Sequence, residues 1–270
     1  MRQFAVKIAI LALILSVMAL IGLGLLASEQ RRILYPGVGA AGTTWTELPA
    51  GYITVTLRTG DGLALRALYR PAAPGKRTIL HFHGNGETVQ GAAREIEPLV
   101  DAGYGALLAE YRGYAGNPGA PDEHGLYRDG EAAISFLRQA GIADSQTIIL
   151  GYSLGSGVAG RMAERHRPAA LILIAPFTSV PEAAADHFGR IPAMLVQDRF
   201  STLSRIGKID CPILLIHGAE DGTVLPENSR VLARATRDAT LKIVPGQGHV
   251  IAYDPIAPGL MLGWLRERGL

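Results

Sequence analysis

The sequence has one cysteine, few aromatic residues and almost no net charge, and each shortage excludes a class of protein. Cys211 stands alone, so the chain forms no intramolecular disulfide, and its apolar surroundings indicate a buried small residue. Aromatic residues make up 6% of the 270, which argues against a surface that stacks on nucleic-acid bases. The net charge of +2 comes without a basic stripe, so no nucleic-acid partner is predicted.

Charge is also missing from one long stretch near the N-terminus. Residues 8–28 carry no charged side chain and are mostly Leu, Ile, Ala and Val. About 20 apolar residues cross a bilayer core as a helix, so we expect residues 1–30 to form a transmembrane anchor. The alternative is a signal peptide, because residues 22–24 offer a small-x-small cleavage site. Positive charges are slightly more numerous before this stretch than directly after it. Because positive residues tend to stay in the cytoplasm, this predicts a cytoplasmic N-terminus and an extracytoplasmic domain.

After a predicted linker at residues 31–50, the pattern indicates one domain over residues 51–270. A hairpin is expected first, and from residue 78 apolar runs alternate with helical segments. This alternation predicts an α/β fold, a mostly parallel sheet with helices on both faces. One helix is expected over residues 87–102. Residues 176–210 interrupt the alternation as a short insertion, with helices expected over residues 183–188 and 193–199. Two interpretations of it remain open: a small cap that shapes a pocket, or simple packing on the sheet.

The most informative motif is the run Gly151-Tyr152-Ser153-Leu154-Gly155. An apolar strand is predicted before it at residues 147–150, and a helix after it at residues 158–167. Strand, Gly-X-Ser-X-Gly and helix together form the context of a nucleophile elbow. Glycine is needed on both sides because a Cβ would collide with the neighbouring chain. The motif predicts that Ser153 is a nucleophile, although 33 glycines also make a chance match possible.

A serine nucleophile requires a base, and the base requires a carboxylate that orients it. Asp221 follows the predicted strand at residues 212–216, and His249 follows the predicted strand at residues 240–244. Sites in parallel sheets form at the carboxyl ends of strands, so we expect both side chains to meet Ser153 there. The alternative carboxylates are Glu220, Asp198 and Asp254. The alternative for His249 is a loop histidine without a role.

The oxyanion of an acyl-transfer intermediate needs two N–H donors. The backbone of Leu154, directly after Ser153, is one candidate. The other is the backbone of Asn85, in the run His83-Gly84-Asn85-Gly86 that follows a predicted strand at residues 78–82. The histidines of this segment are interpreted as structural. No cysteine or carboxylate cluster accompanies them, so no metal site is predicted.

Two further runs complete a resemblance to a known family. They are Glu110-Tyr111-Arg112-Gly113-Tyr114 and the stretch from Gly119 to Asp129. With the elbow, the loop at 83–86 and the segments around Asp221 and His249, they resemble membrane-anchored α/β-hydrolase-domain proteins. That group is related to serine aminopeptidase-like and depalmitoylase-like hydrolases. The depalmitoylase members carry an N-terminal cysteine cluster, which this chain lacks.

The resemblance implies an α/β-hydrolase fold with a triad of Ser153, Asp221 and His249. It implies an oxyanion hole from the backbones of Asn85 and Leu154. The residues expected to contact substrate are Arg112, Tyr114 and Phe177. Glu123 and Asp129 are expected to stabilise the loop after residue 110 and to cap the next helix.

The implied activity is hydrolysis of carboxylic esters or thioesters through an acyl-enzyme, without a cofactor or metal. The expected substrate is a small-molecule or lipidic acyl compound, reached by a membrane-anchored enzyme. One alternative is an amide or peptide hydrolase of the same fold. The other is a non-catalytic binding protein of that fold, because a fold does not fix a function.

Overall fold

An eight-stranded sheet forms the centre of the structure, a computed structural model that describes residues 2–38, 45 and 48–270. Its strands are β1 (Ile53–Arg58), β2 (Ala64–Arg70), β3 (Thr78–Phe82), β4 (Gly105–Ala109), β5 (Thr147–Tyr152), β6 (Ala170–Ile174), β7 (Ile213–Gly218) and β8 (Ala239–Val244). Their order is β1-β2-β4-β3-β5-β6-β7-β8. The pairs β1–β2 and β2–β4 are antiparallel, and every other pair is parallel. The predicted mostly parallel sheet is confirmed.

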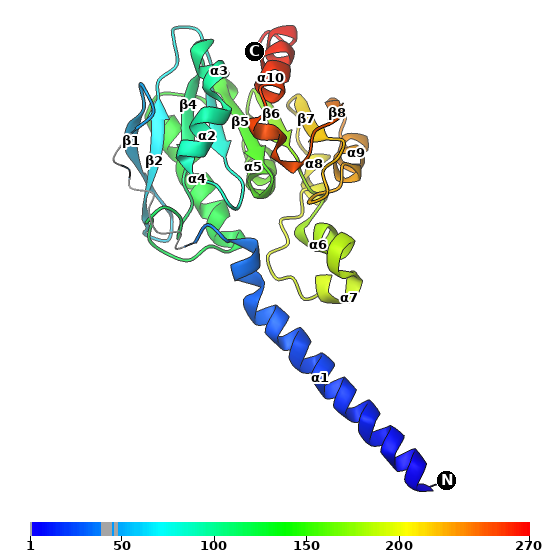
Figure 1. Cartoon of the computed structure of the whole chain (residues 1–270). Coiled ribbons are helices and arrows are strands. Elements are labelled where there is room, and N and C mark those ends of the chain that lie inside the picture. The colour runs from blue at the N-terminus through cyan, green and yellow to red at the C-terminus, as the bar shows by residue number, and fades with distance from the viewer. Residues whose placement is uncertain (1, 39–44, 46–47) are drawn as a thin grey trace.

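Helices cover both faces of this sheet (Figure 1). The helices are α1 (Arg2–Leu34), α2 (Val89–Glu95), α3 (Glu97–Asp101), α4 (Glu123–Gln139), α5 (Leu154–Arg165), α6 (Val180–Phe188), α7 (Arg190–Ala193), α8 (Leu203–Ile206), α9 (Glu227–Arg234) and α10 (Ile256–Glu267). Two short 3₁₀ turns are η1 (Asp144–Gln146) and η2 (His249–Tyr253). The fold is the predicted α/β arrangement.

Two apolar cores lie on opposite faces of the sheet because successive strand side chains point to opposite sides. In β6, Leu171 and Leu173 pack with α4, α5 and α9. Ile172 and Ile174 of the same strand pack with α2, α3 and α10. All five residues of β6 are buried, as expected for a central parallel strand. This double core fixes the carboxyl ends of β3, β5, β7 and β8 along one edge, where the predicted site residues follow.

Two predicted helices differ from the structure, one because of a proline and the other because of contacts with distant segments. The segment expected to form one helix over residues 87–102 forms two helices, α2 and α3. Pro98 has no backbone N–H to donate within a continuous helix, and its ring would clash with the carbonyl four residues earlier. The helix expected over residues 193–199 is absent, and α7 ends at Ala193. There the N–H groups of Gln197 and Arg199 donate to side chains of Gln30 and Glu123, so they do not form helical bonds.

Helix α1 extends from the domain as a single rod, with the N-terminus at its far end (Figure 1). Its stretch Val6–Gly24 has a mean hydropathy of 2.6 and is long and apolar enough to cross a membrane. A signal sequence has the same length and composition, so both interpretations of residues 1–30 stand. The helix continues to Leu34, four residues beyond the expected end of the anchor.

The segment expected as a linker is tied to the domain by two aromatic residues. The Tyr35 hydroxyl is buried and donates to Asp198 Oδ2 over 3.0 Å. Trp45 donates from Nε1 to the carbonyl of Ala115 over 3.1 Å, and the Arg66 guanidinium lies over its ring. The remaining positions of this segment, 39–44 and 46–47, lie outside the described residues.

Candidate active site

Ser153 lies in a sharp turn between β5 and α5, and its backbone has a left-handed φ of 48°. Left-handed φ is unusual for a residue with a Cβ and stores strain, as a nucleophile elbow does. The turn is held by the Ser153 N–H, which donates to the carbonyl of Ile174 over 2.9 Å. Helix α5 starts directly at Leu154, four residues earlier than predicted. The Ser153 hydroxyl therefore stands at the N-terminus of a 12-residue helix.

The two glycines of the motif are required by close packing. A Cβ added to Gly155 would overlap with the carbonyl oxygen of Phe82, at the end of β3. A Cβ added to Gly151 would lie 2.6 Å from the Cβ of Ala159 in α5. The predicted reason for both glycines therefore matches the packing, and the contact brings the turn of Ser153 against the loop after β3.

The structure brings Ser153, His249 and Asp221 together, in the geometry of a serine triad. Ser153 Oγ lies 3.0 Å from His249 Nε2. His249 Nδ1 lies 2.7 Å from Asp221 Oδ2, so the imidazole connects the two oxygens. None of the three alternative carboxylates takes the place of Asp221: Glu220 is exposed, Asp198 accepts from Tyr35, and Asp254 accepts from Gln247.

The carboxylate of Asp221 is buried and surrounded by donors. The N–H groups of Thr223 and Val224 donate to Oδ1 over 2.8 and 2.9 Å. Burial alone would raise the pKa of the Asp221 carboxyl, but hydrogen bonds from His217, His249 and the Val224 backbone hold that pKa well below its usual range. Asp221 is therefore ionised at neutral pH and suited to stabilise a positive charge on His249.

Three side chains that the sequence analysis left without a role support His249. His217 shares Asp221 Oδ2 with it, at 3.1 Å. The Tyr152 hydroxyl donates to the His249 carbonyl over 2.9 Å. Glu87 accepts from the Gly84 N–H over 2.8 Å and from the Tyr253 hydroxyl at the end of η2. Glu87 thus connects the loop of Asn85 to the turn of His249. Each of these three side chains lies within four residues of a predicted site residue in the sequence. That proximity is the only feature of the sequence that could have indicated their role.

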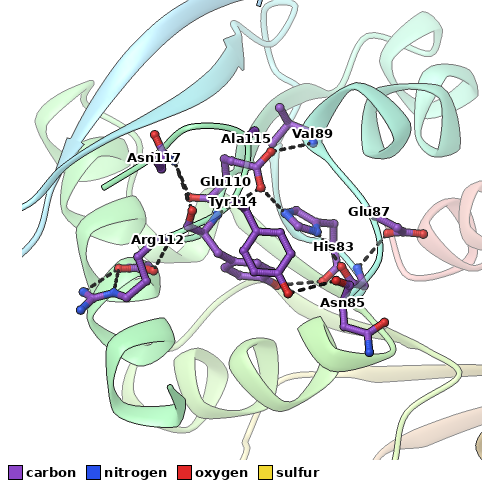
Figure 2. A network of polar contacts seen from close by, with 12 residues as sticks. His83, Asn85, Glu87, Val89, Glu110, Arg112, Tyr114, Ala115 and Asn117 are labelled. Carbon is purple, nitrogen blue, oxygen red and sulfur yellow. Dashed lines mark hydrogen bonds and ion pairs between the residues drawn. The ribbon is translucent and has the colours of Figure 1, made fainter. Parts of the chain in front are cut away.

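A buried ion pair between His83 and Glu110 stabilises the loop that carries Asn85. His83 Nε2 lies 2.7 Å from Glu110 Oε1, and His83 Nδ1 lies 2.7 Å from the carbonyl oxygen of Gly84. Both neighbours accept, so both ring nitrogens carry protons. Burial would lower the pKa of His83, but the Glu110 carboxylate outweighs it and raises that pKa. Figure 2 shows Glu110 between His83 and the Val89 N–H, which donates to Oε2.

Of the three residues predicted to contact substrate, only Phe177 lines the cavity next to Ser153. Arg112 is buried, and its guanidinium bonds to Asp61 and Asp129 at 2.8 Å from each (Figure 2 shows Arg112 turned away from Asn85). Tyr114 is also buried, and its hydroxyl donates to the Asn85 carbonyl over 3.0 Å. Arg112 and Tyr114 therefore support the loops around the site from inside the domain and do not line its cavity.

The expected helix cap also differs. Asp122 is the N-cap of α4 and accepts from the Gly125 N–H over 2.6 Å. The Asp129 carboxylate instead accepts from the backbone N–H and the guanidinium of Arg112. Glu123 accepts from the Tyr127 hydroxyl and from the Arg199 N–H. Asp129 therefore stabilises the predicted loop, Glu123 instead connects α4 to the insertion, and neither residue caps the helix.

An apolar cavity of about 250 Å³ opens above Ser153. Asn85 and Leu154 line it together with Ser153, so the two residues predicted to supply the oxyanion donors adjoin the same cavity as the serine. The other walls come from α1, from α6 and the chain after α7, and from the loop after Asp221. Their lining residues are Gln30, Ile33, Leu34, Phe177, Val180, Ala183, Ala184, His187, Phe188, Ala193, Leu195, Val196, Thr223 and Val224. The insertion at residues 176–210 thus shapes a pocket as well as packing on the sheet.

Among the described residues, no group of three or more His, Cys, Asp or Glu side chains is placed to hold a metal ion. His81 in β3 lies 3.1 Å from Glu95 in α2, and both side chains are fully buried. Cys211 is half-buried, and burial raises the pKa of its thiol to about 12.

The sequence is similar to a described family and to several known proteins. The family described as serine aminopeptidase, S33, matches residues 73–204. An uncharacterized protein of Mycobacterium tuberculosis is 35% identical over 245 residues, which cover 87% of each chain. The lysophosphatidylserine lipase ABHD12 of Danio rerio is 29% identical over 248 residues, covering 84% of this chain and 63% of that protein.

Solved structures share the fold. An esterase of Pyrococcus furiosus has a TM-score of 0.70 at 17% identity, covering 87% of this chain and 99% of its own. A membrane phospholipase A described as a bacterial virulence factor has a TM-score of 0.61 at 16% identity, covering 99% of each chain. Fold and sequence lead to the same family: this chain belongs to the α/β-hydrolase superfamily.

Proposed function

We propose that the protein is a serine hydrolase that cleaves carboxylic esters or thioesters through an acyl-enzyme intermediate. One observation carries the proposal: Ser153 Oγ lies 3.0 Å from His249 Nε2, His249 Nδ1 lies 2.7 Å from buried Asp221, and Ser153 lines a largely apolar cavity. An esterase or lipase type of activity agrees with two similar proteins, one named a lysophosphatidylserine lipase and the other an esterase.

In the first half-reaction, His249 Nε2 takes the proton of Ser153 as Oγ attacks the acyl carbonyl carbon. The negative charge that forms on the carbonyl oxygen is met by the backbone N–H groups of Asn85 and Leu154 and by the positive end of α5. Asp221 keeps the Nδ1 proton of His249 in place and stabilises the imidazolium. His249 then returns its proton to the leaving alcohol or thiol, and the acyl group stays on Oγ.

In the second half-reaction, water enters where the leaving group departed. His249 takes a proton from this water, whose oxygen attacks the acyl carbonyl carbon. The second tetrahedral intermediate uses the same oxyanion donors. When it collapses, His249 gives the proton to Ser153 Oγ, and the carboxylic acid leaves. Protons and electron pairs balance without a cofactor or metal.

The substrate that fits the cavity is an ester with a hydrocarbon acyl chain. Of the 17 lining residues, 12 are Ile, Leu, Val, Ala or Phe, and such side chains favour hydrocarbon over polar groups. One relative is named a lysophosphatidylserine lipase, and a lipidic ester suits an enzyme anchored by residues 1–30. We place the hydrolase domain at residues 51–270 on the extracytoplasmic side, following the charge asymmetry around α1.

The test is hydrolysis of p-nitrophenyl esters and matched acyl thioesters by the full chain in detergent micelles. Ser153→Ala is expected to lower kcat by about 10⁶-fold, the order reported for loss of a triad nucleophile. Ser135→Ala, an exposed serine on α4, serves as the matched control and is expected to keep parent activity. A folded parent protein without hydrolysis would support a non-catalytic binding protein, and cleavage of aminoacyl amides alone would support the amide hydrolase.

A further inference from the structure

The last turn of α1 lines the same cavity as Ser153. Gln30, Ile33 and Leu34 form one wall, and Phe188 and Leu195 of the insertion lie among the residues of the other walls. Of these, Ile33 is 57% exposed and Phe188 is 62% exposed. Apolar side chains that line a cavity and remain this exposed gain free energy when a hydrocarbon covers them.

The end of α1 is fixed against the insertion. Gln30 accepts through Oε1 from the Gln197 N–H over 2.8 Å. One turn later, the buried Tyr35 hydroxyl donates to Asp198 Oδ2, and the Arg31 guanidinium lies 3.7 Å from the same oxygen. Asp198 is itself buried. These contacts determine the width of the cavity between α1 and the insertion.

The same end of α1 holds the loop that carries Asn85. The Asn85 side-chain amide donates to the Leu34 carbonyl over 3.2 Å, and the Gly37 N–H donates to the Asn85 carbonyl over 3.3 Å. A Cβ on Gly37 would overlap with the ring of Tyr114, so the chain after α1 passes directly over this loop. The cavity wall and the candidate oxyanion donor are thus supported by one segment.

We propose that the last turn of α1 is a wall of the acyl-binding pocket and that Ile33 determines which acyl-chain lengths the enzyme accepts. This inference rests on the proposed function. In it, the hydrocarbon chain of the ester lies between Ile33 on α1 and the apolar residues of the insertion. The helix that connects the protein to its N-terminal apolar stretch is then part of the substrate site.

The experiment compares Ile33→Trp with Arg32→Trp in the full chain, in one detergent. Arg32 is the neighbouring position, is exposed and contacts Glu29 outside the cavity, so it receives the same bulk without filling the pocket. We measure kcat/KM for p-nitrophenyl esters from acetate to laurate, and labelling by a fluorophosphonate probe. Ile33→Trp is expected to keep acetate hydrolysis and to lose long-chain hydrolysis, by about fourfold for each methylene that no longer fits.

A smaller side chain gives a graded control. Ile33→Phe is expected to shorten the longest acyl chain that is hydrolysed, but by less than Ile33→Trp does. If Ile33→Trp does not fold, Ile33→Phe alone tests whether Ile33 limits the chain length. Parent-like profiles for both Ile33 variants, with normal labelling, would overturn the wall assignment while the proposed function stands. A parent protein that neither labels nor hydrolyses any ester would instead contradict the proposed function itself.

Discussion

His217 and His249 bind the same carboxylate oxygen of Asp221, at 3.1 and 2.7 Å. His217 Nε2 also lies 2.8 Å from the carbonyl oxygen of Val224, so this nitrogen faces two acceptors and carries a proton. Its Nδ1 lies 2.6 Å from Ser229 Oγ, and the ring is fully buried. His217 is therefore a positioning residue that orients Asp221 toward His249.

Replacing His217 with Leu removes a donor to an ionised carboxylate. A hydrogen bond to a charged group contributes about 1.5–3 kcal/mol, so we expect kcat to fall at least tenfold with little change in KM. His217→Gln, whose amide can still donate, is expected to recover part of the loss. Steady-state kinetics on one short-chain ester, with the melting temperature as a folding control, provide the comparison. Equal activity of parent and His217→Leu would show that Asp221 needs no second donor.

The lowered pKa of Asp221 predicts a pH-dependent stability. A carboxyl whose folded-state pKa lies below its unfolded-state value stabilises the fold fully above that value, about 4, and the contribution is lost as the pH falls further. Asp221→Asn has no such group. We therefore expect the melting temperature of the parent to exceed that of the variant at neutral pH, and the gap to narrow below about pH 4.

The same variant is expected to lower kcat by about 10⁴-fold, as in other serine triads, because the amide holds the wrong imidazole tautomer. A gap in melting temperature that stays constant between neutral and acidic pH would show that the carboxylate is not selectively stabilised in the folded state.

The fold and the meeting of Ser153, Asp221 and His249 at one place were predictable because each depends on a short-range pattern. Continuous apolar runs such as residues 171–174 indicate buried parallel strands, and residues that follow such strands meet at one sheet edge. The need for the elbow glycines was also predictable from the motif, although the Phe82 carbonyl that a Cβ on Gly155 would meet lies 73 residues earlier in the chain.

The side-chain contacts across the site were not predictable, because they join segments far apart in the sequence. Arg112 was expected to contact substrate, but Asp61, 51 residues earlier, and Asp129 bind it inside the domain. Nothing local to Ile33 indicates a cavity wall, because the other walls belong to an insertion about 150 residues later. Likewise, the missing helix after Ala193 depends on acceptors from α1 and α4.

Gly155→Ala tests the packing at the elbow. Because the added Cβ would overlap with a backbone oxygen, the turn cannot relax through a flexible side chain, and we expect a loss of about 3 kcal/mol or more of unfolding free energy. Gly259→Ala on α10 is the matched control, since its Cβ meets no atom within 4 Å and alanine favours helix by up to about 1 kcal/mol. Thermal unfolding of both variants measures the contrast. Similar stability for the two would contradict the packing argument.

Tyr114→Phe tests whether the loop of Asn85 must be held for catalysis. It removes one neutral hydrogen bond, worth about 1 kcal/mol, so we expect kcat to fall about fivefold. KM should not change, because Tyr114 does not line the cavity. Tyr104→Phe removes a comparable hydroxyl, bonded to the Leu270 carbonyl far from the site, and is expected to leave kcat unchanged. Equal kcat for the two variants would remove Tyr114 from the account.

The most direct test of the central claim is the position of a fluorophosphonate adduct on the full-length protein, found by peptide mass spectrometry. The account predicts one adduct, on Ser153, which disappears in Ser153→Ala and weakens strongly in His249→Ala because the hydroxyl loses its base. An adduct on another serine, or labelling that persists in folded Ser153→Ala, would contradict the assignment of Ser153 as the nucleophile.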